Sequence, residues 1–289
     1  VIVIGTALWL TLTDFSKYQP DIQEAISEAT GRDLVIGGDF LIEVFPPSII
    51  AEQVSYANAD WASDEPLVSI GHLSAGINAG VFFGGPVIVE YFRLRDVELV
   101  LEENEDGEVN WSIEQEEDPV PANVEIEASA SRPLVLKSAE LENITVRQRR
   151  PDEEERVFVI STLTASTDDQ DTLRAEGGGE FDGHNLSLNA SLGPLANIGT
   201  DNEVTLDVEA WIDDITAVAN VRHDGERYDL DVELSALEQV GEIAGVTGLP
   251  KGPATAQGAL LIDGNQIGLI DVVVSTSELD LTTSLNAVI

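Results

Sequence analysis

The chain has 289 residues, of which 54 are acidic and 14 are basic, and its formal net charge at pH 7 is −40. Such a charge repels phosphate backbones, which excludes nucleic acid as a partner. Because 43% of the residues are hydrophobic and the acids are interleaved with them, we expect a folded core with an acidic, solvated outer face. The chain has no cysteine, so disulfides and thiol chemistry are excluded.

The first twelve residues, VIVIGTALWLTL, form an apolar run. A membrane-spanning helix needs about 20 apolar residues, and the absence of methionine indicates that the chain begins inside a longer protein. Three interpretations are open: the outer half of a truncated transmembrane helix, the end of a signal peptide, or a buried strand. No small-residue cleavage site follows Leu12, and Trp9 suits a membrane interface. We therefore expect residues 1–13 to be the end of a truncated anchor.

A short helix and a β-hairpin are predicted next. Pro20 begins the helix, apolar residues recur within it at helical spacing, and Gly31 ends it. Apolar residues then alternate over Leu34–Ile36 and again over Phe40–Val44. We expect these two segments to pair as a hairpin whose turn is Gly37-Gly38.

The rest of the chain is predicted to be β-sheet with turns rich in glycine and aspartate. The first strands are expected at Leu67–Ile77, Val87–Leu101 and Val109–Ile113. Leu94–Leu99 echoes Leu136–Leu141, which suggests a weak internal repeat and a sheet built from repeated hairpins.

The second half has the clearest alternation of apolar with acidic or polar residues. Period two places the apolar side chains on one face and the acids on the other, and a slip of one residue would bury carboxylates. The interruption at Leu237–Gly248 has helical spacing and is expected to be a short helix at one end of the sheet. The candidate residues of the apolar face are Val204, Leu206, Val208, Tyr228, Leu230, Val232, Leu234, Leu279 and Leu281.

Catalytic motifs are missing from the sequence. His72, His184 and His223 are isolated, and the last two are expected in solvated turns. No zinc-protease helix motif or nucleophile elbow occurs, and Gly177-Gly178-Gly179 precedes an acidic strand instead of a helix. The acidic segment Glu102–Gly107 lacks the final glutamate of a calcium loop, so a hairpin turn at its Asp-Gly pair is expected. We expect no enzyme activity, no catalytic residue, no metal site and no cofactor.

Several strings occur in a fixed order between Tyr18 and Trp111. They are Ala29-Thr30-Gly31-Arg32, Gly37-Gly38-Asp39, Phe45-Pro46, Ala51-Glu52-Gln53-Val54, Ala57-Asn58-Ala59, Leu94-Arg95-Asp96-Val97-Glu98-Leu99 and Gly107-Glu108-Val109-Asn110-Trp111. The ordered set resembles the AsmA family of bacterial envelope proteins, and the remainder resembles the later β-rich region of that family by pattern more than by motif. The resemblance implies an inner-membrane anchor and a large periplasmic β-structure. It also implies a fold similar to bridge-like lipid transfer proteins, whose sheet curls into an apolar groove.

The predicted fold is therefore mainly β: a long, antiparallel, curled sheet that forms a β-groove, with a short N-terminal helix after a truncated transmembrane segment. Residues 14–118 are expected to be an AsmA-like module of helix and sheet, and residues 119–289 to continue the groove. The acidic segment Glu114–Pro121 is the candidate linker between them.

Two functions depend on what covers the apolar face. A second layer would make a sandwich core, but few helical residues are available, and acyl chains would supply the same apolar contact. The first function is an inner-membrane-anchored, periplasmic lipid-handling protein that binds or conducts phospholipid acyl chains and supports outer-membrane assembly or homeostasis. The alternative is a non-catalytic β-sandwich scaffold or assembly factor. The expected partners are acyl chains, the inner membrane through the anchor, and other envelope proteins.

Overall fold

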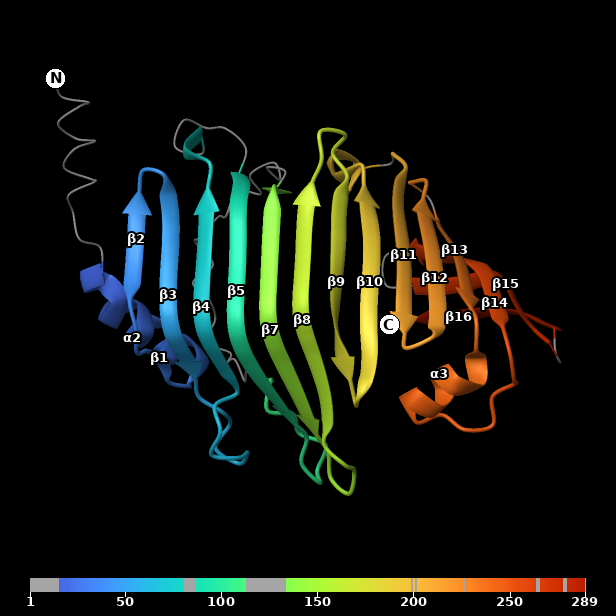
Figure 1. The fold of residues 1–289 in the computed structure, drawn as a ribbon, viewed down its shortest axis with the longest axis horizontal. Coiled ribbons are helices and arrows are strands. Elements are labelled where there is room, and N and C mark those ends of the chain that lie inside the picture. Colours follow the sequence, from blue (N-terminus) through green and yellow to red (C-terminus); the bar gives the residue numbers. More distant parts are fainter. Residues whose placement is uncertain are drawn as a thin grey trace. The chain divides into compact units, whose positions relative to one another are not determined.

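The computed structural model describes the backbone of residues 16–80, 87–112, 134–198, 200, 202–225, 227–263, 266–277 and 280–288. This part of the chain is mainly β (Figure 1). Its helices are η1 (Ser16–Tyr18), α2 (Gln19–Thr30), η3 (Leu195–Asn197) and α3 (Leu237–Ala244). Its strands are β1 (Leu34–Ile36), β2 (Phe40–Val44), β3 (Pro47–Tyr56), β4 (Val68–Ile77), β5 (Val87–Glu102), β6 (Leu134–Leu136), β7 (Ser138–Arg149), β8 (Arg156–Thr167), β9 (Leu173–Phe181), β10 (His184–Gly193), β11 (Val204–Ile212), β12 (Ile215–His223), β13 (Tyr228–Leu234), β14 (Ala254–Asp263), β15 (Gln266–Thr276) and β16 (Asp280–Val288).

The chain divides into two compact units. Unit 1 is Val1–Thr164 with Gly179–Asp182, and unit 2 is Ala165–Gly178 with Gly183–Ile289. In unit 1 the strands are hydrogen-bonded in the order β1-β3-β4-β5-β7-β8, with β2 also on β3 and β6 also on β5. In unit 2 the order is β10-β11-β12-β13-β14-β15-β16, and each of these neighbours is antiparallel. The predicted fold class, a mainly β chain with a long, mostly antiparallel sheet and a short helix near its start, is confirmed.

The predicted first helix is α2. Pro20 stands in its first turn, where a missing N–H costs no hydrogen bond. Gly31 ends the helix in the left-handed region at φ 69°, and its N–H donates to the carbonyl of Ser27 at 2.9 Å. Ile22 packs against the buried cluster of Ile36, Phe40 and Ala51, so α2 covers the apolar side of the first strands of unit 1.

The predicted hairpin at Gly37-Gly38 is wrong. β1 and β2 do not pair with each other, because both lie antiparallel to β3, with Ile36 opposite Val54 and Phe40 opposite Ala51. The chain reverses instead at Phe45-Pro46, which joins β2 to β3.

The two glycines have a different role. The N–H groups of Gly37 and Gly38 donate to the carbonyls of Gln53 and Glu52 on β3 at 3.0 and 3.1 Å. A Cβ at Gly38 would lie 2.8 Å from the Cβ of Glu52. Glycine at these two positions between β1 and β2 therefore permits two backbones to approach closely, instead of forming a tight turn.

The expected hairpin arrangement of the two echoed segments is wrong. β5 and β7 are parallel, and Leu94 lies opposite Leu141. The echo of Leu94–Leu99 in Leu136–Leu141 itself stays a prediction, because strand pairing does not test a sequence repeat.

The predicted strand Val109–Ile113 is also wrong. Val109 forms one isolated bridge with Glu103, a turn follows, and Ile113 lies outside the described residues. The Asn110 side chain is fully buried, accepts from the N–H of Glu102 at 2.8 Å and donates to the carbonyl of Val100 at 2.7 Å. A side chain thus supplies hydrogen bonds that a strand would have supplied from its backbone. The predicted turn before it is present, with the N–H of Gly107 donating to the carbonyl of Asn104 at 3.0 Å.

The expected helix in Leu237–Gly248 is α3, which ends at Gly245 with φ 79°. The triple glycine was expected to precede a strand but lies within β9, and a Cβ at Gly179 would fall 1.8 Å from the carbonyl oxygen of Val159. These glycines serve close strand packing. The expected anchor, residues 1–13, and the candidate linker Glu114–Pro121 lie outside the described residues.

Candidate functional site

The alternating apolar residues of unit 2 share one face of its sheet. Leu206 lies opposite Val221 across β11 and β12, and Val221 lies opposite Leu230 across β12 and β13. Residues directly opposite each other in an antiparallel pair project to the same side. The register therefore brings together seven predicted residues, which we call the apolar face: Val204, Leu206, Val208, Tyr228, Leu230, Val232 and Leu234.

The register also adds residues that the sequence reading missed. β12 lies between the two predicted strands and contributes small alanines, whose alternation gives only a weak signal. β10 contributes a strict alternation that was available in the sequence. The added residues are Leu186, Leu188, Ala190, Leu192, Ala217, Ala219, Val221, Ala254 and Ala256.

Of the nine residues predicted for the apolar face, Leu279 and Leu281 are not among the seven that the register brings together. Leu279 lies outside the described residues. Leu281 belongs to β16, where its backbone is paired with Val274 of β15.

No side chain among the seven residues of the apolar face is buried; each keeps part of its surface in contact with water. Among the described residues of unit 2, the buried apolar ones are Ile215, Ala254 and Ala259. Burying apolar surface contributes about 25 cal/mol per Å². The apolar face can therefore still gain free energy by contact with an apolar ligand or partner.

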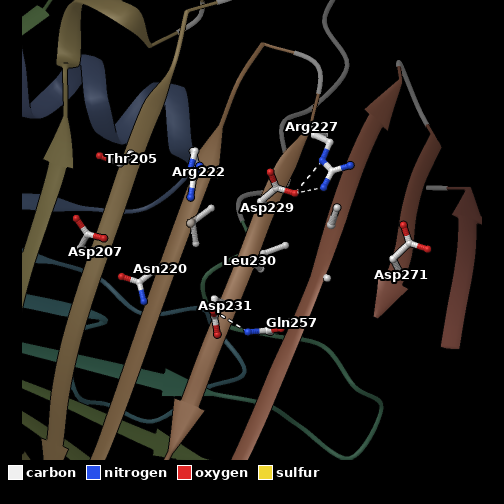
Figure 2. A pocket seen from close by; sticks show the side chains of 13 residues that line it. Thr205, Asp207, Asn220, Arg222, Arg227, Asp229, Leu230, Asp231, Gln257 and Asp271 are labelled. Atoms are coloured by element: carbon white, nitrogen blue, oxygen red, sulfur yellow. Dashed lines mark hydrogen bonds and ion pairs between the residues drawn. The ribbon is translucent and has the colours of Figure 1, made fainter. Parts of the chain in front are cut away.

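The opposite face of the same strands is polar. A cavity of about 680 Å³ lies among these side chains, and Figure 2 shows residues that line it. The Nε of Arg227 donates to Asp229 Oδ1 at 2.8 Å, and this hydrogen bond raises the pKa of Arg227. Gln257 Nε2 donates to Asp231 Oδ2 at 2.9 Å. Most of the residues that line the cavity are charged or polar, but Val221 and Leu230, whose register places them with the apolar face, also line it. Its polar lining residues are Thr205, Asp207, Asn220, Arg222, Arg227, Asp229, Asp231, Gln257 and Asp271.

The histidines differ from the sequence expectation. His184 begins β10 and its Nδ1 lies 2.8 Å from Asp213 Oδ2, a contact that lowers the pKa of Asp213. His223 ends β12 and stacks on Tyr228 with ring centroids 4.3 Å apart. Both are thus strand residues at the ends of their strands, each with a side-chain partner, and the His184 side chain is 39% exposed. His72 lies in β4 with Nδ1 3.4 Å from Glu52 Oε1. Within the described ranges, no three histidine, aspartate or glutamate side chains are grouped to hold a metal ion.

Three of the seven strings that carry the family resemblance meet in unit 1 around the buried Asn110. The Arg32 guanidinium donates to the carbonyls of Asn110 and Ser112. Asn110 Nδ2 donates to Asn58 Oδ1 at 2.8 Å. Three segments that are far apart in the sequence are thereby joined through one buried amide.

Glu102 closes the same cluster and is 7% exposed. Its Oε2 accepts from the Ser63 N–H at 2.8 Å and from Asn58 Nδ2 at 3.2 Å, and its Oε1 accepts from Arg149 at 3.0 Å. Burial alone would raise the pKa of Glu102, but the hydrogen bonds from Ser63 and the charge of Arg149 together lower it. The cluster holds a charged carboxylate inside the fold, which marks it as a structural clamp.

In the ranges that the structure describes, no helix has the length and apolar character needed to cross a membrane.

The comparisons with known proteins agree with the resemblance. The model of the AsmA family matches residues 1–209, which include all of the strings around Asn110 and the first strand of the apolar face. No curated protein matches the chain.

Proposed function

Because the chain belongs to the AsmA family of envelope-associated proteins, we propose that it is a periplasmic lipid-handling protein anchored in the inner membrane. In this proposal the apolar face of unit 2 holds phospholipid acyl chains, and the protein supports outer-membrane assembly or homeostasis. It is not an enzyme, and neither a catalytic residue nor a cofactor is assigned.

The observation that carries this proposal is the combination of shared register and incomplete burial. The residues of the apolar face project to one side, yet none of them is buried. Each methylene of an acyl chain that leaves water contributes about 0.8 kcal/mol. Such contact has no preferred direction, so we expect low selectivity among phospholipids and easy movement of a chain along the strands.

The experiment is native mass spectrometry of the full chain, purified with its lipids and transferred out of detergent. We expect phospholipid masses at a defined stoichiometry. The double variant Leu206→Asp/Leu230→Asp places two carboxylates on the apolar face and should abolish lipid retention. The matched control is Ser187→Asp/Thr255→Asp, which adds the same charge at exposed residues of the polar face. Equal retention by the two double variants would count against the apolar face as the site.

A second candidate function is favoured by the first strands of unit 1. The outward backbone groups of β1 are already bonded to α2, because the N–H groups of Leu34 and Ile36 donate to the side chains of Ser27 and Gln23. Among the described strands, β2 pairs only with β3, and it exposes Leu41 at 48%. A free edge with exposed apolar side chains can accept a strand from a partner protein. If the full chain takes up no lipid from detergent or from liposomes, this scaffold function becomes the better account, and Leu41→Lys should then weaken binding of an envelope-protein partner.

A further inference from the structure

Four residues form a row across unit 1 at which the strands depart from regular geometry. We call Gln53, Gly71, Asp96 and Asn143 the transverse row. Gln53, Asp96 and Asn143 have φ of 53°, 53° and 56° in the middle of β3, β5 and β7. The four residues lie side by side across β3, β4, β5 and β7, because the residues that flank them are paired across these strands. The pairs on one side of the row join Glu52, His72, Arg95 and Glu142, and the pairs on the other side join Val54, Ile70, Val97 and Ile144.

The transverse row shifts the alternation of side chains between the two faces of the sheet by one residue. In a regular strand, residues three apart project to opposite faces. Ala51 and Val54 are three apart, yet both pack in the cluster with Ile36 and Phe40. The left-handed residue between them, Gln53, takes up one step of the alternation. Apolar side chains before and after the row therefore remain on one face.

Gly71 is the glycine of this row for a steric reason. A Cβ at Gly71 would lie 2.7 Å from the Cβ of Asp96 on the neighbouring strand. Atoms of this kind do not approach so closely, so the left-handed conformation at Asp96 requires a glycine opposite it.

Unit 2 contains a related left-handed residue in β15, where it belongs to a β-bulge and not to a row across several strands. Asp271 has φ 52°. Leu269 and Val272 are three apart, yet they lie opposite Leu285 and Thr283, which are two apart on β16. Again a glycine is beside the bulge, since a Cβ at Gly258 would lie 2.9 Å from Val272 Cγ2.

The sequence around these residues is repeated. An apolar residue, any residue, aspartate or asparagine, and then valine or isoleucine occur at Leu94–Val97, Leu141–Ile144 and Leu269–Val272. Asparagine and aspartate adopt the left-handed region more readily than other non-glycine residues. The repeat therefore has a conformational meaning.

We infer that Asp96, Asn143 and Asp271 are positioning residues: by adopting the left-handed conformation inside a strand, they keep the apolar side chains before and after them on one face of the sheet, which for Asp271 is the side of unit 2 that we propose contacts lipid. Their role in alternation stands on the geometry alone, whereas their role in lipid contact rests on the proposed function.

The first test compares glycine with valine at two positions of β5 in the full chain. In an ordinary strand position valine is favoured over glycine. At Glu98, whose side chain is 60% exposed, we expect this order, with Glu98→Val melting above Glu98→Gly. At Asp96 we expect the reverse, with Asp96→Gly melting at least about 3 °C above Asp96→Val. The same order at both positions would overturn the inference, and failure of Asp96→Val alone to fold would support it.

The second test follows side-chain orientation through thiol reactivity, since the natural chain has no cysteine. Val97 is 7% exposed and the Glu98 side chain is 60% exposed. We therefore expect Glu98→Cys to react with a water-soluble maleimide at least about tenfold faster than Val97→Cys. Adding Asp96→Gly should preserve that ratio, and adding Asp96→Val should reduce it at least threefold. An unchanged ratio in a folded Asp96→Val protein would show that the left-handed residue does not set the alternation.

Lipid retention by native mass spectrometry completes the test. Asp271→Gly should retain phospholipid, and Asp271→Val should lose it. If the unmodified chain holds no phospholipid, the proposed function fails while the melting and thiol results still decide the role of these residues. If the unmodified chain and Asp271→Val retain lipid equally, only the link between alternation and lipid contact fails.

Discussion

The two units treat the apolar side of their sheets differently. In unit 1, α2 lies over the first strands, and Phe40 and Ala51 are 4% and 5% exposed. In unit 2, the seven residues of the apolar face have the same alternating pattern but remain partly exposed. A pattern of apolar residues in the sequence thus fixes which side chains share a face, but not whether the chain covers that face itself.

The two units also differ in their number of basic residues. Ten of the fourteen basic residues fall in unit 1. There Arg149 pairs with Glu65, Glu102 and Glu155, and these partners raise its pKa. Unit 2 also forms ion pairs, such as Arg174 with Asp168 and Arg227 with Asp229, but it has only four basic residues with which to neutralise its acids.

The largest contrast should come from truncating one apolar side chain in each unit. Phe40→Ala removes a buried ring and should cost about 4 kcal/mol. Leu206→Ala removes a side chain that is already partly exposed and should cost about 1 kcal/mol. Hydrogen exchange measured on peptides of each unit would give both values. Equal losses would mean that the apolar face is covered in solution, and the comparison between the units would then fail.

The clamp of unit 1 should be nearly as sensitive. Asn110→Ala leaves the Glu102 N–H, the Val100 carbonyl and Asn58 without their buried partner, and should cost about 3 kcal/mol. Urea denaturation followed by tryptophan fluorescence would measure it. Ser112→Ala is the control, because its exposed side chain makes none of these bonds and its backbone carbonyl, which accepts from Arg32, is retained. A loss confined to unit 2 would contradict the assignment of the clamp to unit 1.

Glu102 gives the clamp a pH dependence whose sign follows from its pKa. Its pKa is lowered from the ordinary 4.5. The stabilisation is therefore present above pH 4.5 and is lost as the pH falls through the lower value that applies in the folded state. Glu102→Gln should cost about 2 kcal/mol at pH 7, and its difference from the unmodified chain should shrink below about pH 4.5. Denaturation curves between pH 3 and pH 7 would test this, and a constant difference across that range would contradict it.

The sequence predicted these regions unequally for physical reasons. Regular alternation in Val204–Val208 and Tyr228–Leu234 fixed the shared face, because period two has one geometric meaning. Helix signals at Pro20 and Gly31 were equally direct. The Gly37-Gly38 pair led to a wrong hairpin prediction, because glycine occurs both in tight turns and where two strands approach closely. Only the position of the partner strand distinguishes the two cases.

The roles of the clamp and of the positioning residues could not be predicted from the sequence, because both depend on contacts with distant segments. Asn110 was read as part of a strand, since nothing local reveals that its side chain reaches Asn58. Asp96 breaks the alternation of Leu94 and Val97, and that break was the available signal for a left-handed residue. Its meaning depended on a neighbouring strand, because Gly71 lies opposite in β4.

The smallest effects should come from the glycines that end the two helices. Gly31 and Gly245 have φ of 69° and 79°, and a Cβ at either one meets no atom within 4 Å. Gly31→Ala and Gly245→Ala therefore test backbone conformation without a clash, and each should cost about 1 kcal/mol. The comparison between the units lies in how far that loss spreads. α2 packs on the buried cluster of Ile36, Phe40 and Ala51 through Ile22, so Gly31→Ala should raise hydrogen exchange in β1 and β2 as well as in the helix. Because the apolar face is not buried by its own unit, Gly245→Ala should raise exchange in α3 while β11 and β13 change little. Equal spread in both units would mean that α3 supports the apolar face as α2 supports the first strands.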